Sequence, residues 1–303
     1  MKSGYSLVSP LLLSLSLQMP LLAGEPAGVL SAPVAAAPVG DADAQYQMAR
    51  AYLRGDGVPK DVQKSYDLMK AAAAQGHADA TGGIGYFYSS GMVVAKDERQ
   101  AADWFRKGAE MGSAKAQLNL GKYLLNGKAA VANPEAQPAD LETEGLKWIG
   151  KAADQGLPEA ASSYGMILYF GEHGQPQDYT KAAVYLKIAA ESGMADAQNA
   201  LGLMYDQGLG VNADPAAAED WLRKAALQGQ VKAQANLGRV LNPLSEKKET
   251  RIEALAWLEM AANQNDVTAR KSIADATPGL KEGDLDAART RALELRKLLM
   301  KKP

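Results

Sequence analysis

The chain has no cysteine, and its 303 residues include only two histidines. Without cysteine there can be no disulfide framework, no thiol nucleophile and no zinc site built on thiolates. His77 and His173 both fall in expected turns, and neither has a carboxylate or a second histidine at a metal-ligand spacing. We expect both histidines to be ordinary surface residues, and we expect no metal and no other cofactor.

An excess of charge of one sign is also lacking, because 33 Lys and Arg stand against 35 Asp and Glu. This balance gives no electrostatic footprint for nucleic acid. No Gly-x-Ser-x-Gly elbow is present. Residues 82–85 superficially suggest a phosphate loop, but they fall inside an expected helix, and 55–61 lacks the carboxylates of a calcium loop. We expect a protein that is not an enzyme and has no catalytic residues.

What the chain does contain is a signature that recurs about every 36 residues. Units open at separations of 36, 36, 44, 37, 36 and 36 residues, at Ala44, Ala80, Ala116, Ala160, Ala197, Ala233 and Ala269. They close at Gly76, Gly112, Gly156, Gly193, Gly229 and Asn265. Self-similarity at this period predicts a stack of repeats, each burying its apolar face against its neighbours.

The fifth unit, residues 194–229, shows how one repeat is built. Apolar residues at helical spacing between Ala197 and Tyr205 predict a first helix with a narrow buried stripe. Asp214 and Pro215 then predict the start of a second helix, because aspartate accepts the free amide protons and proline has no amide to lose. Trp221 and its apolar neighbours form the second stripe.

Equivalent positions in the other units extend this pattern. The expected helix starts are Asp61, Asp97, Asp178 and Thr250, with a less regular one at Asp140. Inside the first helix, glycine recurs at Gly85, Gly121, Gly165, Gly202 and Gly238. Since glycine costs about 1 kcal/mol against alanine in a helix, its recurrence predicts close approach of the paired helix. At the last unit end, Asn265 is the next best residue after glycine for a left-handed cap.

The pattern A-x-x-x-L-G-x-M-Y-x-x-G-x-G-V-x-x-D-x-x-x-A-x-x-W-x-x-K-A-A-x-x-G, read from Ala197 to Gly229, resembles the Sel-1-like repeat family, which is related to tetratricopeptide repeats. The likeness covers about residues 42–266. It implies an all-α fold, a right-handed α-solenoid of about six helix-turn-helix repeats. Unit three departs from the pattern by an insertion around 128–140, and unit six lacks the inter-helix glycines.

The two ends differ from the repeats. Residues 1–24 combine Lys2 with a short leucine-rich run and predict a signal peptide, and 25–41 is an Ala/Pro-rich segment expected to be a disordered linker. Glu25 stands where a lipidated cysteine would be, so no lipid anchor is expected, and the leucine run is too short and broken to span a bilayer. Residues 267–303 predict two C-terminal capping helices, the last of them basic on its outer side. Export without cysteine favours a bacterial periplasm.

The first helix of each repeat carries side chains that lie off its core stripe. By resemblance to tetratricopeptide arrays, these residues line a concave groove that binds another protein. The expected partner-binding residues are Arg50, Tyr86, Lys122, Met166, Tyr169, Phe170, Leu203, Asp206 and Arg239, with Tyr169 and Phe170 the densest apolar pair. A tight superhelix that buries some of them against the neighbouring unit is the alternative.

The expected function is therefore a non-catalytic periplasmic adaptor or envelope scaffold that binds a protein partner. A periplasmic immunity protein that neutralises a type VI secretion phospholipase effector is a second interpretation, which the resemblance also allows. A peptidoglycan-associated factor is a third, but a modifying enzyme would need an acidic catalytic pair that the sequence does not reveal. No nucleic acid and no stable membrane span are expected.

Overall fold

The structure is a computed structural model that describes residues 41–127, 137–242 and 244–300. The expected signal peptide, nearly all of the expected linker and most of the insertion at 128–140 lie outside these residues. The described residues fall into two compact units, which meet in the sequence between Gln155 and Gly156. They contain fourteen α-helices, one short 3-10 helix and no strand, so the expected all-α solenoid fold is confirmed.

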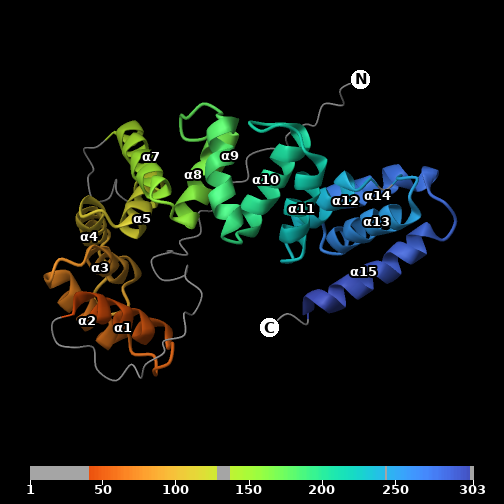
Figure 1. The fold of residues 1–303 in the computed structure, drawn as a ribbon. Coiled ribbons are helices and arrows are strands. Elements are labelled where there is room, and N and C mark those ends of the chain that lie inside the picture. The colour runs from red at the N-terminus through yellow and green to blue at the C-terminus, as the bar shows by residue number, and fades with distance from the viewer. Residues whose placement is uncertain (1–40, 128–136, 243, 301–303) are drawn as a thin grey trace. The chain divides into compact units, whose positions relative to one another are not determined.

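Unit 1 contains three helix pairs (Figure 1). They are α1 (Ala42–Arg54) with α2 (Val62–Ala74), α3 (Ala78–Ser90) with α4 (Glu98–Glu110), and α5 (Ala114–Leu125) with α7 (Pro138–Asp154).

Unit 2 contains three more pairs and the C-terminal helices. The pairs are α8 (Pro158–Phe170) with α9 (Tyr179–Glu191), α10 (Ala195–Gln207) with α11 (Pro215–Ala226), and α12 (Val231–Val240) with α13 (Lys248–Ala262). They are followed by α14 (Val267–Ala276), the 3-10 helix η1 (Thr277–Gly279) and α15 (Asp284–Met300).

Four of the expected helix starts are confirmed by their cap geometry. The carboxylates of Asp61, Asp97, Asp178 and Asp214 each accept a hydrogen bond from a backbone amide in the first turn of the helix that follows. The other two expectations are wrong. Helix α13 is capped by Lys247, three residues before the predicted cap at Thr250. Asp140 lies inside the first turn of α7, after Pro138. In the third and sixth repeats the residues between the two helices depart from the common pattern. The start of the second helix therefore cannot be placed by its spacing to the tryptophan.

The residues that close the repeats adopt the left-handed conformation that the sequence predicts. The five closing glycines adopt positive φ angles, and Asn265 adopts a φ of 67° in the same role. The residue that follows is the N-cap of the next first helix. A left-handed residue is therefore what sends the chain from one repeat into the next.

The glycines inside the first helices lie against the second helices, as expected. A Cβ atom added to Gly202 would lie 2.7 Å from Cγ of Leu222, and one added to Gly238 would lie 2.7 Å from the carbonyl oxygen of Ala254. Within α3, Gly85 approaches the ring of Phe105 on α4, Gly83 approaches Met69 on α2 and Gly82 approaches Ala116 on α5. That run packs helices and forms no loop.

The core of each unit is made of many alanines and a few large side chains. In unit 1, Phe87 and Phe105 are fully buried, and in unit 2 Trp257 is fully buried. Helix α15 adds Ala292 and Leu295 to the cluster around Trp257. The expected C-terminal helices are therefore present, and α15 extends the core of the last repeats.

Candidate protein-binding surface

In each unit, the first helices of successive repeats form one row. Helix α3 lies beside α5 in unit 1, and in unit 2 α8, α10, α12 and α14 lie beside one another in chain order. The second helices of adjacent repeats approach one another less closely. Because first helices converge while second helices spread, the first helices form the inner side of each unit. Some side chains of these first helices point away from the core, on the inner side of the unit. We name them the inner surface.

In unit 1 the expected binding residues differ in accessibility. Arg50 is only 7% exposed, and its guanidinium donates to Gln47 and lies 5.7 Å from the centre of the Tyr46 ring. Tyr86 and Lys122 are half-buried. Burial raises the pKa of the Tyr86 hydroxyl, so this group remains a neutral donor and acceptor at ordinary pH.

In unit 2 the same helical position holds Met166 on α8, Leu203 on α10 and Arg239 on α12, all of them half-buried. Arg239 donates to the side chain of Asn236, and Asn236 donates to Oδ1 of Asn199 across the helices at 2.8 Å. Asp206 is exposed one turn after Leu203. The structure thus places half-buried apolar side chains on α8 and α10, and a chain of hydrogen-bonded polar side chains between α10 and α12.

Tyr169 and Phe170 are in edge-to-face contact, with ring centres 5.0 Å apart, but they differ in accessibility. Tyr169 is 7% exposed and also packs against Tyr179, whereas Phe170 is 39% exposed at the end of α8. Burial first, and then the neighbouring Tyr179, raises the pKa of Tyr169. Only Phe170 of this pair presents a large apolar surface to solvent, and Tyr169 supports it from below.

A set of polar contacts that the sequence analysis missed joins successive first helices. The cap residue of one first helix contacts an acidic residue in the first turn of the preceding one, 34 residues earlier. The pairs are His77 with Asp43, Ser113 with Asp79, and Gln230 with Asp196.

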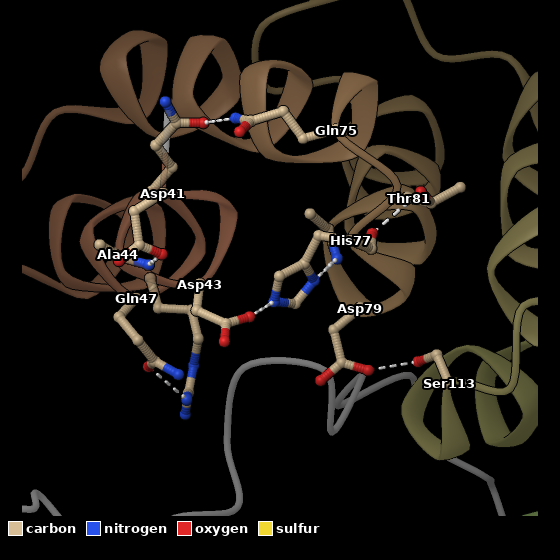
Figure 2. Close-up of polar contacts among 12 residues, drawn as sticks. Asp41, Asp43, Ala44, Gln47, Gln75, His77, Asp79, Thr81 and Ser113 are labelled. Atoms are coloured by element: carbon tan, nitrogen blue, oxygen red, sulfur yellow. Dashed lines mark hydrogen bonds and ion pairs between the residues drawn. The ribbon is translucent and has the colours of Figure 1, made fainter. Parts of the chain in front are cut away.

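His77 shows this contact in most detail (Figure 2). Its Nδ1 accepts from the backbone amide of Ala80 at 3.2 Å, and its Nε2 lies 3.1 Å from Oδ1 of Asp43. The ring also packs against Tyr46 at 4.5 Å between centres, and the side chain is only 14% exposed. The expectation of an ordinary surface histidine is therefore wrong for His77. It is a helix cap that joins two repeats, and a single-repeat pattern gives no signal for a contact between repeats.

Paired glutamines form a second contact that the sequence analysis missed. In four repeats, the side-chain amide near the end of the second helix donates to a glutamine of the first helix at 2.7–2.8 Å. The pairs are Gln75 to Gln45, Gln155 to Gln117, Gln228 to Gln198, and Gln264 to Gln234. The other two repeats have neither glutamine. That joint presence or absence is the signal that would have revealed the pairs.

Charged side chains bridge the second helices within each unit. The guanidinium of Arg106 on α4 binds Glu144 on α7, which also accepts from the indole of Trp148. Burial alone would raise the pKa of Glu144, but the hydrogen bonds from Arg106 and Trp148 hold it below its usual value. Arg223, Glu253 and Trp257 repeat this arrangement between α11 and α13. These charges are neutralised within the fold.

The described residues contain neither a metal-binding cluster nor a membrane-spanning helix. No group of three or more His, Asp or Glu in the described ranges could hold a metal ion. No described helix is long and apolar enough to cross a bilayer.

This arrangement of paired helices defines an α-solenoid repeat protein. The model of the family described as Sel1 repeat matches residues 42–77, 78–113, 114–157, 158–194, 195–230 and 231–266. The chain therefore belongs to the Sel1 repeat family, and its repeats form a module of the kind that binds other proteins.

Several known proteins are similar to it. A Sel1 repeat protein from Oxalobacter formigenes is 27% identical with a TM-score of 0.54, covering 73% of this chain and 85% of that one. The antigen c5321 of uropathogenic Escherichia coli is 25% identical with a TM-score of 0.47, covering 86% and 61%. Immunity protein Pa5087 from Pseudomonas aeruginosa is 24% identical with a TM-score of 0.43, covering 80% and 86%. Neither of these last two likenesses bears on what this chain binds.

A segment covering 27% of this chain is 38% identical, over 82 residues, to chitin synthase regulatory factor 3 of Schizosaccharomyces pombe. The segment spans only 9% of that protein's length.

Proposed function

We propose that the protein is a non-catalytic adaptor of the bacterial periplasm that binds a protein partner on its inner surface, with Phe170 as the main anchor. The observation that carries the proposal is the exposure of Phe170 at the end of an inner helix, on top of the buried Tyr169 and near the half-buried Met166. Binding energy concentrates in a few large side chains that become fully buried in the complex. In unit 2 we assign Leu203, Asp206 and Arg239 to the same surface. The corresponding residues of unit 1 are Tyr86 and Lys122, and the buried Arg50 supports them.

Replacing Phe170 by alanine should weaken partner binding by about 2 kcal/mol or more. Phe170→Ala alone is a cleaner test than Phe170→Ala combined with Tyr169→Ala. Tyr169 is buried, and its loss would leave a destabilising cavity in the unit. The matched control is Val184→Ala, since Val184 is 58% exposed on the second helix α9, away from the inner row. Affinity for the purified partner and far-UV circular dichroism would be measured for both variants.

The partner is found first by placing a photo-crosslinking amino acid at position 170, at 203 and at 184 in turn. We expect one shared adduct from positions 170 and 203 and none from 184. An adduct that forms only from position 184, or equal affinity of Phe170→Ala and the unaltered chain, would contradict binding on the inner surface. An envelope component as partner supports the scaffold role, and a secreted phospholipase supports the immunity role.

The periplasmic part of the proposal rests on the sequence of residues 1–24. The mature chain should begin soon after Ala23 and appear in the periplasmic fraction, because a leucine-rich run after Lys2 is typical of export signals. Intact-mass measurement of the protein from its native host tests this directly. Recovery from the cytosol with Met1 still present would overturn it.

A further inference from the structure

Unit 2 contains a cavity of about 690 Å³ between α15 and the ends of α11 and α13. We name it the α15 groove and define it by Gln228, Met260, Gln264, Leu293, Arg296 and Leu299. Its volume is in the range of pockets that hold small ligands or short segments of chain. The inner-surface residues Phe170, Leu203 and Arg239 do not line it.

The floor of the groove is apolar. Met260 is 7% exposed, and Leu299 is a half-buried neighbour of the same core cluster, together with Ala292. Leu293 projects beside this floor with 59% of its surface exposed. An apolar side chain of a ligand would remove this leucine surface from water.

One wall of the groove carries two arginines of α15 that differ in their surroundings. Arg289, nearer the start of α15, lies 3.6 Å from Glu259 and 3.3 Å from Asp286, so its charge is compensated. Arg296, two turns further along the helix, forms no ion pair or hydrogen bond within the part of the chain that the structure describes. A guanidinium beside an apolar floor is suited to a carboxylate, which it can bind through two hydrogen bonds.

The opposite wall presents hydrogen-bond acceptors. The Nε2 group of Gln228 donates to the carbonyl oxygen of Gly193 and to Gln198, and that of Gln264 donates to Gln234 and to the carbonyl oxygen of Met260. An amide nitrogen has two protons, so both donors of each glutamine are used inside the fold. The Oε1 atoms of the exposed Gln228 and Gln264 are therefore left to accept hydrogen bonds, and a ligand with N–H groups can donate to them.

We propose that the α15 groove binds an extended segment of a partner protein that carries a carboxylate beside an apolar side chain. A peptide supplies all three matching groups: backbone N–H donors for the glutamines, an apolar side chain for the floor and a carboxylate for Arg296. A fatty acid or a lipid phosphate satisfies Arg296 and the floor but brings no N–H group to the glutamines. The carboxylate comes either from an acidic side chain or from the end of the partner's chain.

The test uses the full chain and a fluorescein-labelled peptide of alternating leucine and glutamate, followed by fluorescence anisotropy. Arg296→Glu should weaken binding by about tenfold or more, because an attraction becomes a repulsion. The control, Lys297→Glu, makes the same change in net charge at the next residue of α15, whose side chain does not line the groove, and should stay within about twofold. A second matched pair is Leu293→Ser in the groove and Leu298→Ser outside it, which are 59% and 57% exposed in the unaltered chain.

Three further peptides identify the source of the carboxylate. A glutamine-for-glutamate peptide with an amidated end should not bind, and restoring either the glutamates or the free end shows which carboxylate Arg296 recognises. The proposal is overturned if the first peptide fails to bind, if Arg296→Glu and Lys297→Glu weaken it equally, or if only vesicles of anionic lipid bind and lose binding in Arg296→Glu. Phe170→Ala should leave peptide binding unchanged, so this outcome is independent of the proposed inner surface.

Discussion

Gly121→Leu should destabilise unit 1 more than any exchange of an exposed charge. A Cβ atom at position 121 would lie 2.5 Å from Cγ1 of Ile149 and 2.7 Å from the carbonyl oxygen of Gly145. Because one of these contacts is to backbone, α5 and α7 must move apart before any side chain fits. Overpacking of this kind typically costs about 1–3 kcal/mol and sometimes more. We expect the upper end, measured as a lower thermal midpoint by circular dichroism.

Related glycines give a graded comparison. Gly165→Leu and Gly202→Leu should cost less than Gly121→Leu, because their closest neighbours are the side-chain atoms of Leu186 and Leu222, which can shift. Lys147→Leu on the exposed side of α7 is the control and should change the midpoint little. Equal midpoints for all four variants would contradict the assignment of these glycines to helix contacts.

The sequence predicts those features that each repeat specifies for itself. Caps such as Asp97 and Asp214, the closing Asn265 and the inner Gly202 act within one repeat or its own helix pair, so they recur at a fixed spacing. The predicted helix start at Thr250 is wrong because the residues before it lack the common turn, and helix α13 starts earlier. The fold was predictable because six repeats carry the same caps, closing residues and apolar stripes at a fixed spacing.

The pattern of a single repeat did not predict most contacts between repeats. His77 occupies a cap position where other repeats have aspartate, serine, leucine, methionine or glutamine, and only the structure shows Asp43 beside it. The α15 groove brings Gln228 together with Arg296 from outside the repeats, and no periodic signal joins these two residues. On the inner surface, composition suggested both Tyr169 and Phe170, but packing against Tyr179 is what buries the first of them.

Loss of the ion pair between Arg251 and Asp284 should be the second large effect. Nε of Arg251 donates to Oδ2 of Asp284 at 2.6 Å, and the two side chains are only 3% and 2% exposed. Arg251 also donates to the carbonyl oxygen of Ser245, and the amide of Lys281 donates to Asp284. The pair therefore fixes the start of α15 to the start of α13, and with it one wall of the α15 groove.

Asp284→Ala should lower the thermal midpoint by roughly 10 °C at neutral pH, because it leaves the buried Arg251 charge without its partner. The double variant Arg251→Met with Asp284→Ala should be more stable than Asp284→Ala alone, since the unpaired charge is then gone. Thermal melts of the two single variants, the double variant and the unaltered chain provide the full cycle. A double variant that loses the sum of both single losses would show that the two residues act independently.

The same pair predicts a dependence on pH. The hydrogen bond from Arg251 lowers the pKa of Asp284, although burial opposes it, so the folded-state pKa lies below that of an unfolded aspartate. A depressed folded-state pKa contributes stability that is complete above the ordinary aspartate pKa of about 3.9 and is lost as the pH falls through the lowered value. The gap in midpoint between the unaltered chain and Asp284→Ala should therefore be widest near neutral pH and narrow below about pH 4. A gap that stays constant down to acid pH would mean that Asp284 stabilises α15 by packing and hydrogen bonding alone, without its charge.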